Sequence, residues 1–254
     1  MEIDETRHTG VWPFNMLPAG MAGRPRDPNA VRAEVFDPVA LAFSASPKFI
    51  DAGWIGLDVM PSSFLYKIMD AEKAGVTLAT LISTWVDDNR GHIADGYERR
   101  LRAYSFDDLA RRALHEALLS YRSGSYLSVV RTLMPEFERF GRMVVLADGS
   151  KPKNQKEAVK AIQDYISELP VGFYPPIESL AAYSLLSEDL FAKCFKEADA
   201  LALSNPNRHA EMHGLASYGD LRGATKVLSA ADFMVSAVNS AIARNASQGT
   251  SSSS

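Results

Sequence analysis

The stretch that decides the fold spans residues 106–146 and reads FDDLARRALHEALLSYRSGSYLSVVRTLMPEFERFGRMVVL. Its apolar residues recur at every third or fourth position, the spacing that places them on one face of a helix. Gly124 interrupts the pattern, which then resumes with the same spacing. The stretch therefore predicts two helices, over about 106–122 and 125–146, joined by a short turn as a helical hairpin.

The same periodicity recurs on both sides of this hairpin, whose start at Ser105 and Asp108 resembles a capping box. Segment 76–87 is apolar and β-branched, and it fits a buried helix or a strand equally well, while 87–92 is turn-like. We predict a mostly α fold, with an up-and-down helical bundle in the C-terminal half and an irregular or helical N-terminal region. Further helices are predicted at 62–73, 155–168, 177–203 and 220–243.

Composition divides the chain into three parts. Prolines and glycines punctuate residues 1–48, which predicts an irregular arm. We expect this arm and a small subdomain of unknown role to occupy 1–104, followed by the helical domain at 105–245. The Ser-rich sequence at 246–254 predicts a disordered tail.

Net charge and cysteine content exclude some classes of protein. The formal net charge of −4 argues against a uniformly basic nucleic-acid coat, although a local basic pocket stays compatible with it. The one cysteine, Cys194, excludes an intrachain disulfide and favours a reducing compartment. Its apolar surroundings favour a small buried side chain over a nucleophile. With no signal peptide and no apolar run of the ~18 residues that span a membrane, we expect a cytoplasmic protein without a membrane partner.

A second stretch, residues 204–220, holds the groups that could carry chemistry and reads SNPNRHAEMHGLASYGD. Asn205 before Pro206 predicts the start of a helix, because asparagine caps helices and proline suits the first helical position. Asn207 then falls in the first turn as a cap or phosphate contact. Free amides and the helix dipole favour a bound phosphate there.

Arginine and histidine side chains follow directly in this stretch. His209 and His213 are four residues apart and therefore share one face of the predicted helix. Arg208 is long enough to swing toward His213. Cleavage of an RNA phosphodiester uses such groups, since an imidazole moves protons at the 2′-oxygen or the leaving 5′-oxygen and a cation stabilises the charged transition state.

Residues 207–214 resemble the motif of the HEPN superfamily, helical ribonucleases that carry an arginine, a polar residue, three further residues and a histidine. The string Arg208-His209-Ala210-Glu211-Met212-His213 matches each defined position, and the flanking Asn207 and Gly214 extend the match to the form NRHxxxHG. Residues 116–139 also resemble the first helical pair of that superfamily, with the Pro-x-x-Glu string that ends at Glu138. The resemblance covers about 105–243.

The resemblance implies a metal-independent endoribonuclease without a cofactor, acting on RNA as a homodimer whose two motifs face each other. Arg208 and His213 would be the catalytic pair and His209 the supporting polar residue, with Asn207 and Glu138 binding substrate or supporting the site. The ribose 2′-OH would attack the adjacent phosphate and leave a cyclic phosphate. Many members are toxins or defence effectors, and some are inactive RNA binders.

Two structural interpretations fit the same residues. Arg208 and His213 could tie the last two helices together, with Glu211 or Asp220 as the ion-pair partner. His209 and His213 also have the spacing of two metal ligands, but no third ligand is identifiable nearby, so no metal is predicted.

The role of Glu138 and the function of the chain can each be interpreted in a second way. Glu138 could orient an imidazole across the bundle, or it could be a solvated acid on a helix face. The alternative function is a non-catalytic helical module. Such a module would bind a structured RNA, or a protein partner through the N-terminal region.

Overall fold

The computed structural model describes residues 59–71, 75–104, 106–147, 192–203 and 205–251, and also residues 52, 54, 157, 160 and 190. The predicted arm at 1–48 and most of the helices predicted at 155–168 and 177–203 lie outside them. The described residues form helices and no strand. The predicted mostly α bundle is therefore confirmed.

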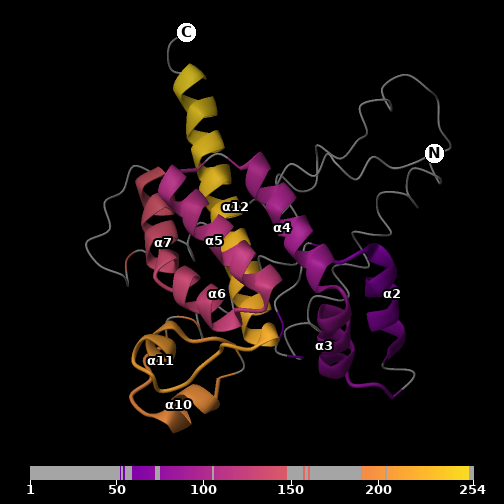
Figure 1. Cartoon of the computed structure of the whole chain (residues 1–254). Coiled ribbons are helices and arrows are strands. Elements are labelled where there is room, and N and C mark those ends of the chain that lie inside the picture. Colours follow the sequence, from indigo (N-terminus) through magenta and orange to yellow (C-terminus); the bar gives the residue numbers. More distant parts are fainter. Residues whose placement is uncertain are drawn as a thin grey trace, which may run out of the picture.

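Nine helices can be followed along the described residues (Figure 1). They are α2 (Ser62–Ala71), α3 (Leu78–Asp88), α4 (Arg90–Ala103), α5 (Asp108–Ser123), α6 (Tyr126–Leu133), α7 (Glu136–Ala147), α10 (Glu197–Leu201), α11 (Arg208–Met212) and α12 (Leu221–Ser251).

The first helix of the predicted hairpin, α5, has a well-defined cap at each end. Asp107 caps its start, because Oδ1 of Asp107 accepts hydrogen bonds from the amides of Leu109 and Ala110 at 2.9 and 3.0 Å. The cap is thus Asp107 and not the Ser105–Asp108 pair that the sequence suggested. Gly124 ends the helix with a φ of 81°, a left-handed conformation that glycine adopts at little cost.

Two other boundaries differ from the predicted ones. The helix predicted over 125–146 is divided into α6 and α7 at Pro135, because proline lacks the amide proton that would continue the hydrogen-bond ladder. Segment 76–87 is resolved as helix α3. The turn predicted at 87–92 is a single residue, Asn89, whose side-chain amide donates to the carbonyl of Trp85 at 2.8 Å.

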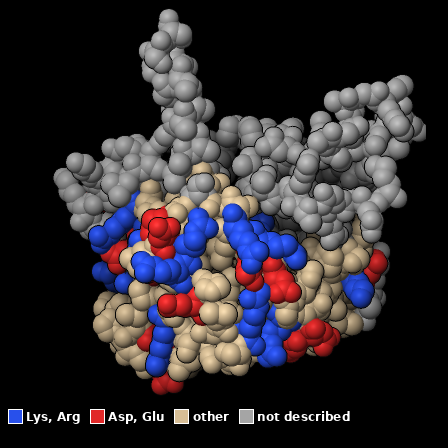
Figure 2. Space-filling model, turned by 45° about the horizontal axis from the view of Figure 1, so that its top comes forward, with Lys and Arg blue, Asp and Glu red and all other residues tan. Residues whose placement is uncertain are grey.

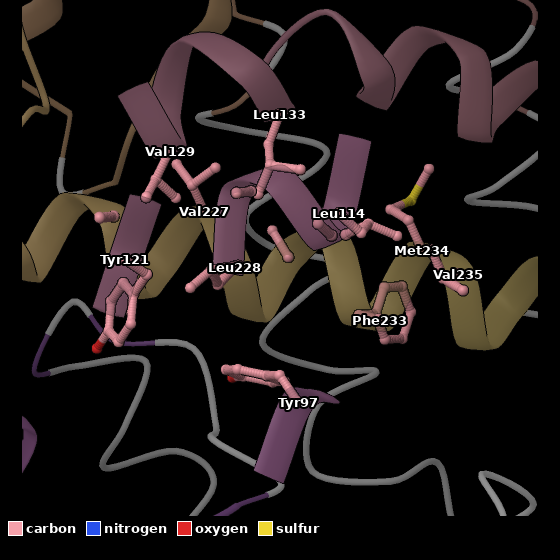
Figure 3. Close-up of a cluster of buried hydrophobic side chains, with 14 of the residues drawn as sticks. Tyr97, Leu114, Tyr121, Val129, Leu133, Val227, Leu228, Phe233, Met234 and Val235 are labelled. Carbon is pink, nitrogen blue, oxygen red and sulfur yellow. The ribbon is translucent and has the colours of Figure 1, made fainter. Parts of the chain in front are cut away.

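Helix α12 forms the centre of the bundle. Every residue from 223 to 235 is buried, so this part of the helix is enclosed by its neighbours on all sides. Figure 1 shows α12 alongside α5, α6 and α7. In Figure 3 its side chains meet Tyr97 of α4, Leu114 of α5 and Leu133 of α6.

Buried polar contacts fix the position of α12 in this core. The hydroxyl groups of Tyr97 and Ser229 share a hydrogen bond of 2.5 Å, and those of Tyr121 and Thr225 share one of 2.8 Å. Burial raises the pKa of Tyr121 to about 12. Because the two pairs link α12 to two different helices, sliding α12 along its axis would break both hydrogen bonds.

The core crosses residue 104, where we predicted a domain boundary. It includes Trp54, Tyr97 and Tyr104 on one side and the helices α5 to α7 on the other. Helices α2 to α4 therefore pack as part of the same body as the rest of the bundle. At the other end α12 continues to Ser251, into the segment 246–254 for which composition predicted disorder. That segment has no proline, and its one glycine costs a helix only about 1 kcal/mol.

The surface of the bundle carries both signs of charge. Figure 2 shows one face on which lysine and arginine are interspersed with aspartate and glutamate. Arg122 of α5, for example, donates to Asp95 and Glu98 of α4 at 2.7 and 2.6 Å. Among the described helices, none is long and apolar enough to cross a membrane.

Candidate functional site

The residues of the predicted site lie in a small lobe beside the end of α6, formed by α10, α11 and the segments around them (Figure 1). The lobe has a core of its own, in which Cys194, Ala200 and Ala210 are buried. Cys194 is therefore a packed small side chain, as predicted. The helix predicted over 177–203 is not continuous, because residues 192–195 are not helical and Lys196 is extended.

Helix α11 has only five residues. It begins after Asn207, whose Oδ1 accepts a hydrogen bond from the amide of Ala210 at 2.7 Å, so the cap is Asn207 and not Asn205. The helix ends at Met212, and Gly214 turns the chain with a φ of 68°. A helix of five residues with a capped amide gives little support to the phosphate site that we expected at its N-terminus.

The two histidines of the motif lie together, as their spacing predicted. The ring centroids of His209 and His213 are 4.3 Å apart, with 41° between the ring planes. His213 is exposed and His209 is half-buried. Nδ1 of His209 is buried without a hydrogen-bond partner among the described residues, and the ring of Phe195 meets His209 edge-on at 6.2 Å.

The arginine of the motif contacts the bundle through Glu138. Nη2 of Arg208 donates to Oε2 of Glu138 at 3.3 Å, and each side chain is about a quarter exposed. Arg142, one turn along α7, donates to the other oxygen of Glu138. Glu138 is therefore brought to the site, but it contacts the guanidinium group and not an imidazole. Nε of Arg208 is buried and has no hydrogen-bond partner in the described part of the chain.

The two acids that we named as partners of Arg208 have other contacts. Glu211 is 3% exposed, and its Oε2 accepts from the amide of Tyr218 at 3.0 Å. Its Oε1 lies 3.8 Å from Nε of Arg131 on α6. Asp220 caps α12 by accepting from the amide of Gly223 at 2.6 Å. Sequence spacing could not reveal the contact of Glu211 with Arg131, because it joins residues on different helices.

The site has a fixed cation, two adjacent imidazoles and a carboxylate that holds the cation. The described residues contain no cluster of three or more histidine, cysteine, aspartate or glutamate side chains suited to a metal ion. Comparisons with family models, curated proteins and solved structures find no match for this chain. A function must therefore be inferred from the geometry around Arg208 and from the motif at 207–214.

Replacing Asn207 with alanine is expected to loosen the lobe. Asn207 is fully buried, and besides capping α11 it donates through Nδ2 to the carbonyl of Ala192 at 3.0 Å. Loss of both bonds should cost about 1–3 kcal/mol. Hydrogen exchange of the Ala210 amide would measure this, with Asn207→Ser as the matched variant that keeps a capping oxygen. Unchanged protection in Asn207→Ala would show that the two bonds do not hold the lobe.

Proposed function

We propose that this chain is a metal-independent endoribonuclease of the HEPN type, with Arg208 and His213 acting on the scissile phosphate. One observation carries the proposal. The exposed imidazole of His213, at the C-terminal end of α11, packs on His209 with the ring centroids 4.3 Å apart, and Arg208 is the first residue of the same helix. A titratable group that is open to solvent thus lies at one end of a five-residue helix and a permanent cation at the other, two groups that phosphodiester cleavage can use.

The chemistry follows from the properties of these groups. His213 would serve as general base for the ribose 2′-OH or as general acid for the leaving 5′-oxygen, and His209 would hold its ring in place. Arg208 would donate to two phosphate oxygens and stabilise the charge that develops in the transition state. Glu138 would act as a positioning residue, since it holds one end of the guanidinium group. The products would be a cyclic phosphate and a 5′-hydroxyl, and DNA should be spared because it lacks the 2′-OH.

The proposal includes a homodimer in the cytoplasm. In the superfamily that the motif resembles, two copies of the motif face each other across a two-fold axis, which would place a second Arg208 and His213 near the same RNA. A role as a toxin or defence effector would fit such an enzyme. A chain that is monomeric at micromolar concentration would count against this part of the proposal.

A second function, a non-catalytic module that binds RNA or a protein partner, is favoured by a different observation. Arg208 contacts Glu138 of α7, and Glu211 contacts both Arg131 of α6 and the amide of Tyr218. These contacts tie α11 to the bundle. If the residues of the motif had only a structural role in the lobe, they would make these same contacts.

Cleavage of RNA in excess EDTA tests the two functions against each other. The substrate is a mixed pool of structured and single-stranded RNA, incubated with the wild-type chain or with the Arg208→Ala/His213→Ala variant. We expect the wild-type chain to cleave despite EDTA and the variant to leave the RNA intact, because no metal takes part. If neither chain cleaves, the ribonuclease proposal is wrong and the binding module is favoured.

A further inference from the structure

Phe195 has an unusual environment for a large aromatic side chain. It is 77% exposed, although phenylalanine is normally buried. It is not isolated, because its ring meets the ring of His209 at 6.2 Å with 63° between the planes. His209 in turn packs on His213. A solvent-facing aromatic ring therefore lies two ring contacts from the proposed catalytic imidazole.

The segment that carries Phe195 is held in place. Oδ2 of Asp199 accepts hydrogen bonds from the amides of Phe195 and Lys196 at 3.0 and 3.2 Å. Cys194 is buried in the core of the lobe, and the carbonyl of Ala192 accepts from Asn207 at 3.0 Å. The backbone on both sides of the ring is thus fixed, so a ligand that stacks on Phe195 would lose little free energy to ordering it.

Two lysines flank the ring along the chain, and the exposed Glu197 follows the second of them. Lys193 and Lys196 are both exposed, and the string Lys193-Cys194-Phe195-Lys196 places a lysine on either side of the aromatic residue. Proteins that bind single-stranded nucleic acids combine these two features, with aromatic rings under the bases and cations along the phosphates. A surface that binds a protein partner would need the exposed ring but not the two lysines, so the combination favours a nucleic acid.

We infer that Phe195 is a stacking platform for one nucleobase beside the scissile phosphate, with Lys193 and Lys196 contacting the neighbouring phosphates. The inference rests on the proposed ribonuclease function and specifies its substrate as single-stranded RNA. In a duplex the bases are paired and stacked on each other, so none is available to the ring. Phe195 is a binding residue in this arrangement, and the chemistry remains with Arg208 and His213.

Binding measured without cleavage tests the inference. The His213→Ala chain is titrated into a fluorescein-labelled oligouridylate and the anisotropy is followed. Adding Phe195→Ala should weaken binding about 5- to 150-fold, the loss expected for one stacked base, whereas Phe195→Trp should preserve it. Tyr66→Ala on α2 is the matched control, because Tyr66 is also an exposed aromatic residue, at 51%. It should leave binding unchanged.

Two further measurements separate stacking from a structural effect. Lys193→Ala and Lys196→Ala should each lower the slope of log affinity against log salt concentration by about 0.7. Phe195→Ala should leave that slope and the melting temperature as they were. A paired RNA duplex should bind more weakly than the oligouridylate and should not respond to Phe195→Ala.

The outcomes distinguish this inference from the function on which it rests. If the wild-type chain cleaves RNA in EDTA while Phe195→Ala binds as tightly as its parent, the stacking inference is overturned and the ribonuclease stands. If Phe195→Ala weakens binding in a chain that never cleaves, the stacking platform stands and the ribonuclease is overturned. If Phe195→Ala leaves RNA binding unchanged but changes the oligomeric state, the ring belongs to an interface between copies of the chain and the inference is wrong.

Discussion

Replacing Asp232 with alanine is expected to destabilise the bundle by about 3–5 kcal/mol, because it removes the carboxylate that pairs with a buried arginine. Nε of Arg100 on α4 donates to Oδ2 of Asp232 on α12 at 2.9 Å, and the two side chains are only 10% and 6% exposed. Equilibrium unfolding in urea, followed by circular dichroism, would measure the loss.

The matched variant removes both charges together. Arg100→Met/Asp232→Leu keeps the volume of the pair without a buried charge, and it should be far closer to the wild type than Asp232→Ala is. Arg122→Ala is the control for an exposed ion pair, and it should cause a much smaller loss because solvent screens its contacts. Equal losses in Asp232→Ala and the double variant would show that burial of the charge is not the cause.

The pH dependence of stability provides a second test of this pair. Burial raises the pKa of Asp232 above its ordinary value of 3.8, and Arg100 opposes the change without reversing it. The folded chain therefore holds this proton more tightly than the unfolded chain does. The stabilisation from this proton is fully present below pH 3.8 and is lost as the pH rises through the folded pKa. Relative to the double variant, the wild type should lose stability over that range.

Much of the bundle could be predicted because its signals are local. The spacing of apolar residues located α2, α5 and α12, and Gly124 located the turn after α5. The differences are also local. The apolar spacing predicts a continuous helix through Pro135, although this proline divides α6 from α7. The sequence offers both Asn205 and Asn207 as capping residues, and the structure shows that Asn207 caps α11.

At the candidate site, contacts between residues close in sequence could be predicted and contacts between distant residues could not. The contact between His209 and His213 followed from a spacing of four residues. The contact of Arg208 with Glu138 spans 70 positions, and nothing in the sequence could choose Glu138 over Glu211 as its partner. Phe195 was missed for the same reason, since the break before α10 that brings its ring to His209 depends on contacts within the lobe.

Replacing His213 with alanine is expected to slow RNA cleavage about 10²- to 10⁴-fold while leaving the fold intact. The rate should fall because the proton at the 2′-oxygen or the leaving oxygen loses its carrier. The stability should change by less than about 0.5 kcal/mol, because the side chain of His213 is exposed. Single-turnover cleavage and thermal unfolding of the same preparations would measure both. His115→Ala on α5 is the control, since that exposed histidine lies outside the site.

Variants of Arg208 and Glu138 test whether this ion pair serves catalysis or only holds the lobe in place. If Arg208 stabilises the transition state, Arg208→Ala should slow cleavage about 10²- to 10³-fold, and Arg208→Lys should restore little, because lysine lacks the planar pair of donors. Glu138→Gln should slow cleavage less than Arg208→Ala does, because glutamine can still accept a hydrogen bond from the guanidinium group and the cation itself remains. Equal rate losses in the two variants, matched by equal falls in melting temperature, would show that the ion pair only holds α11 against α7. His213 would then need another source of positive charge at the phosphate.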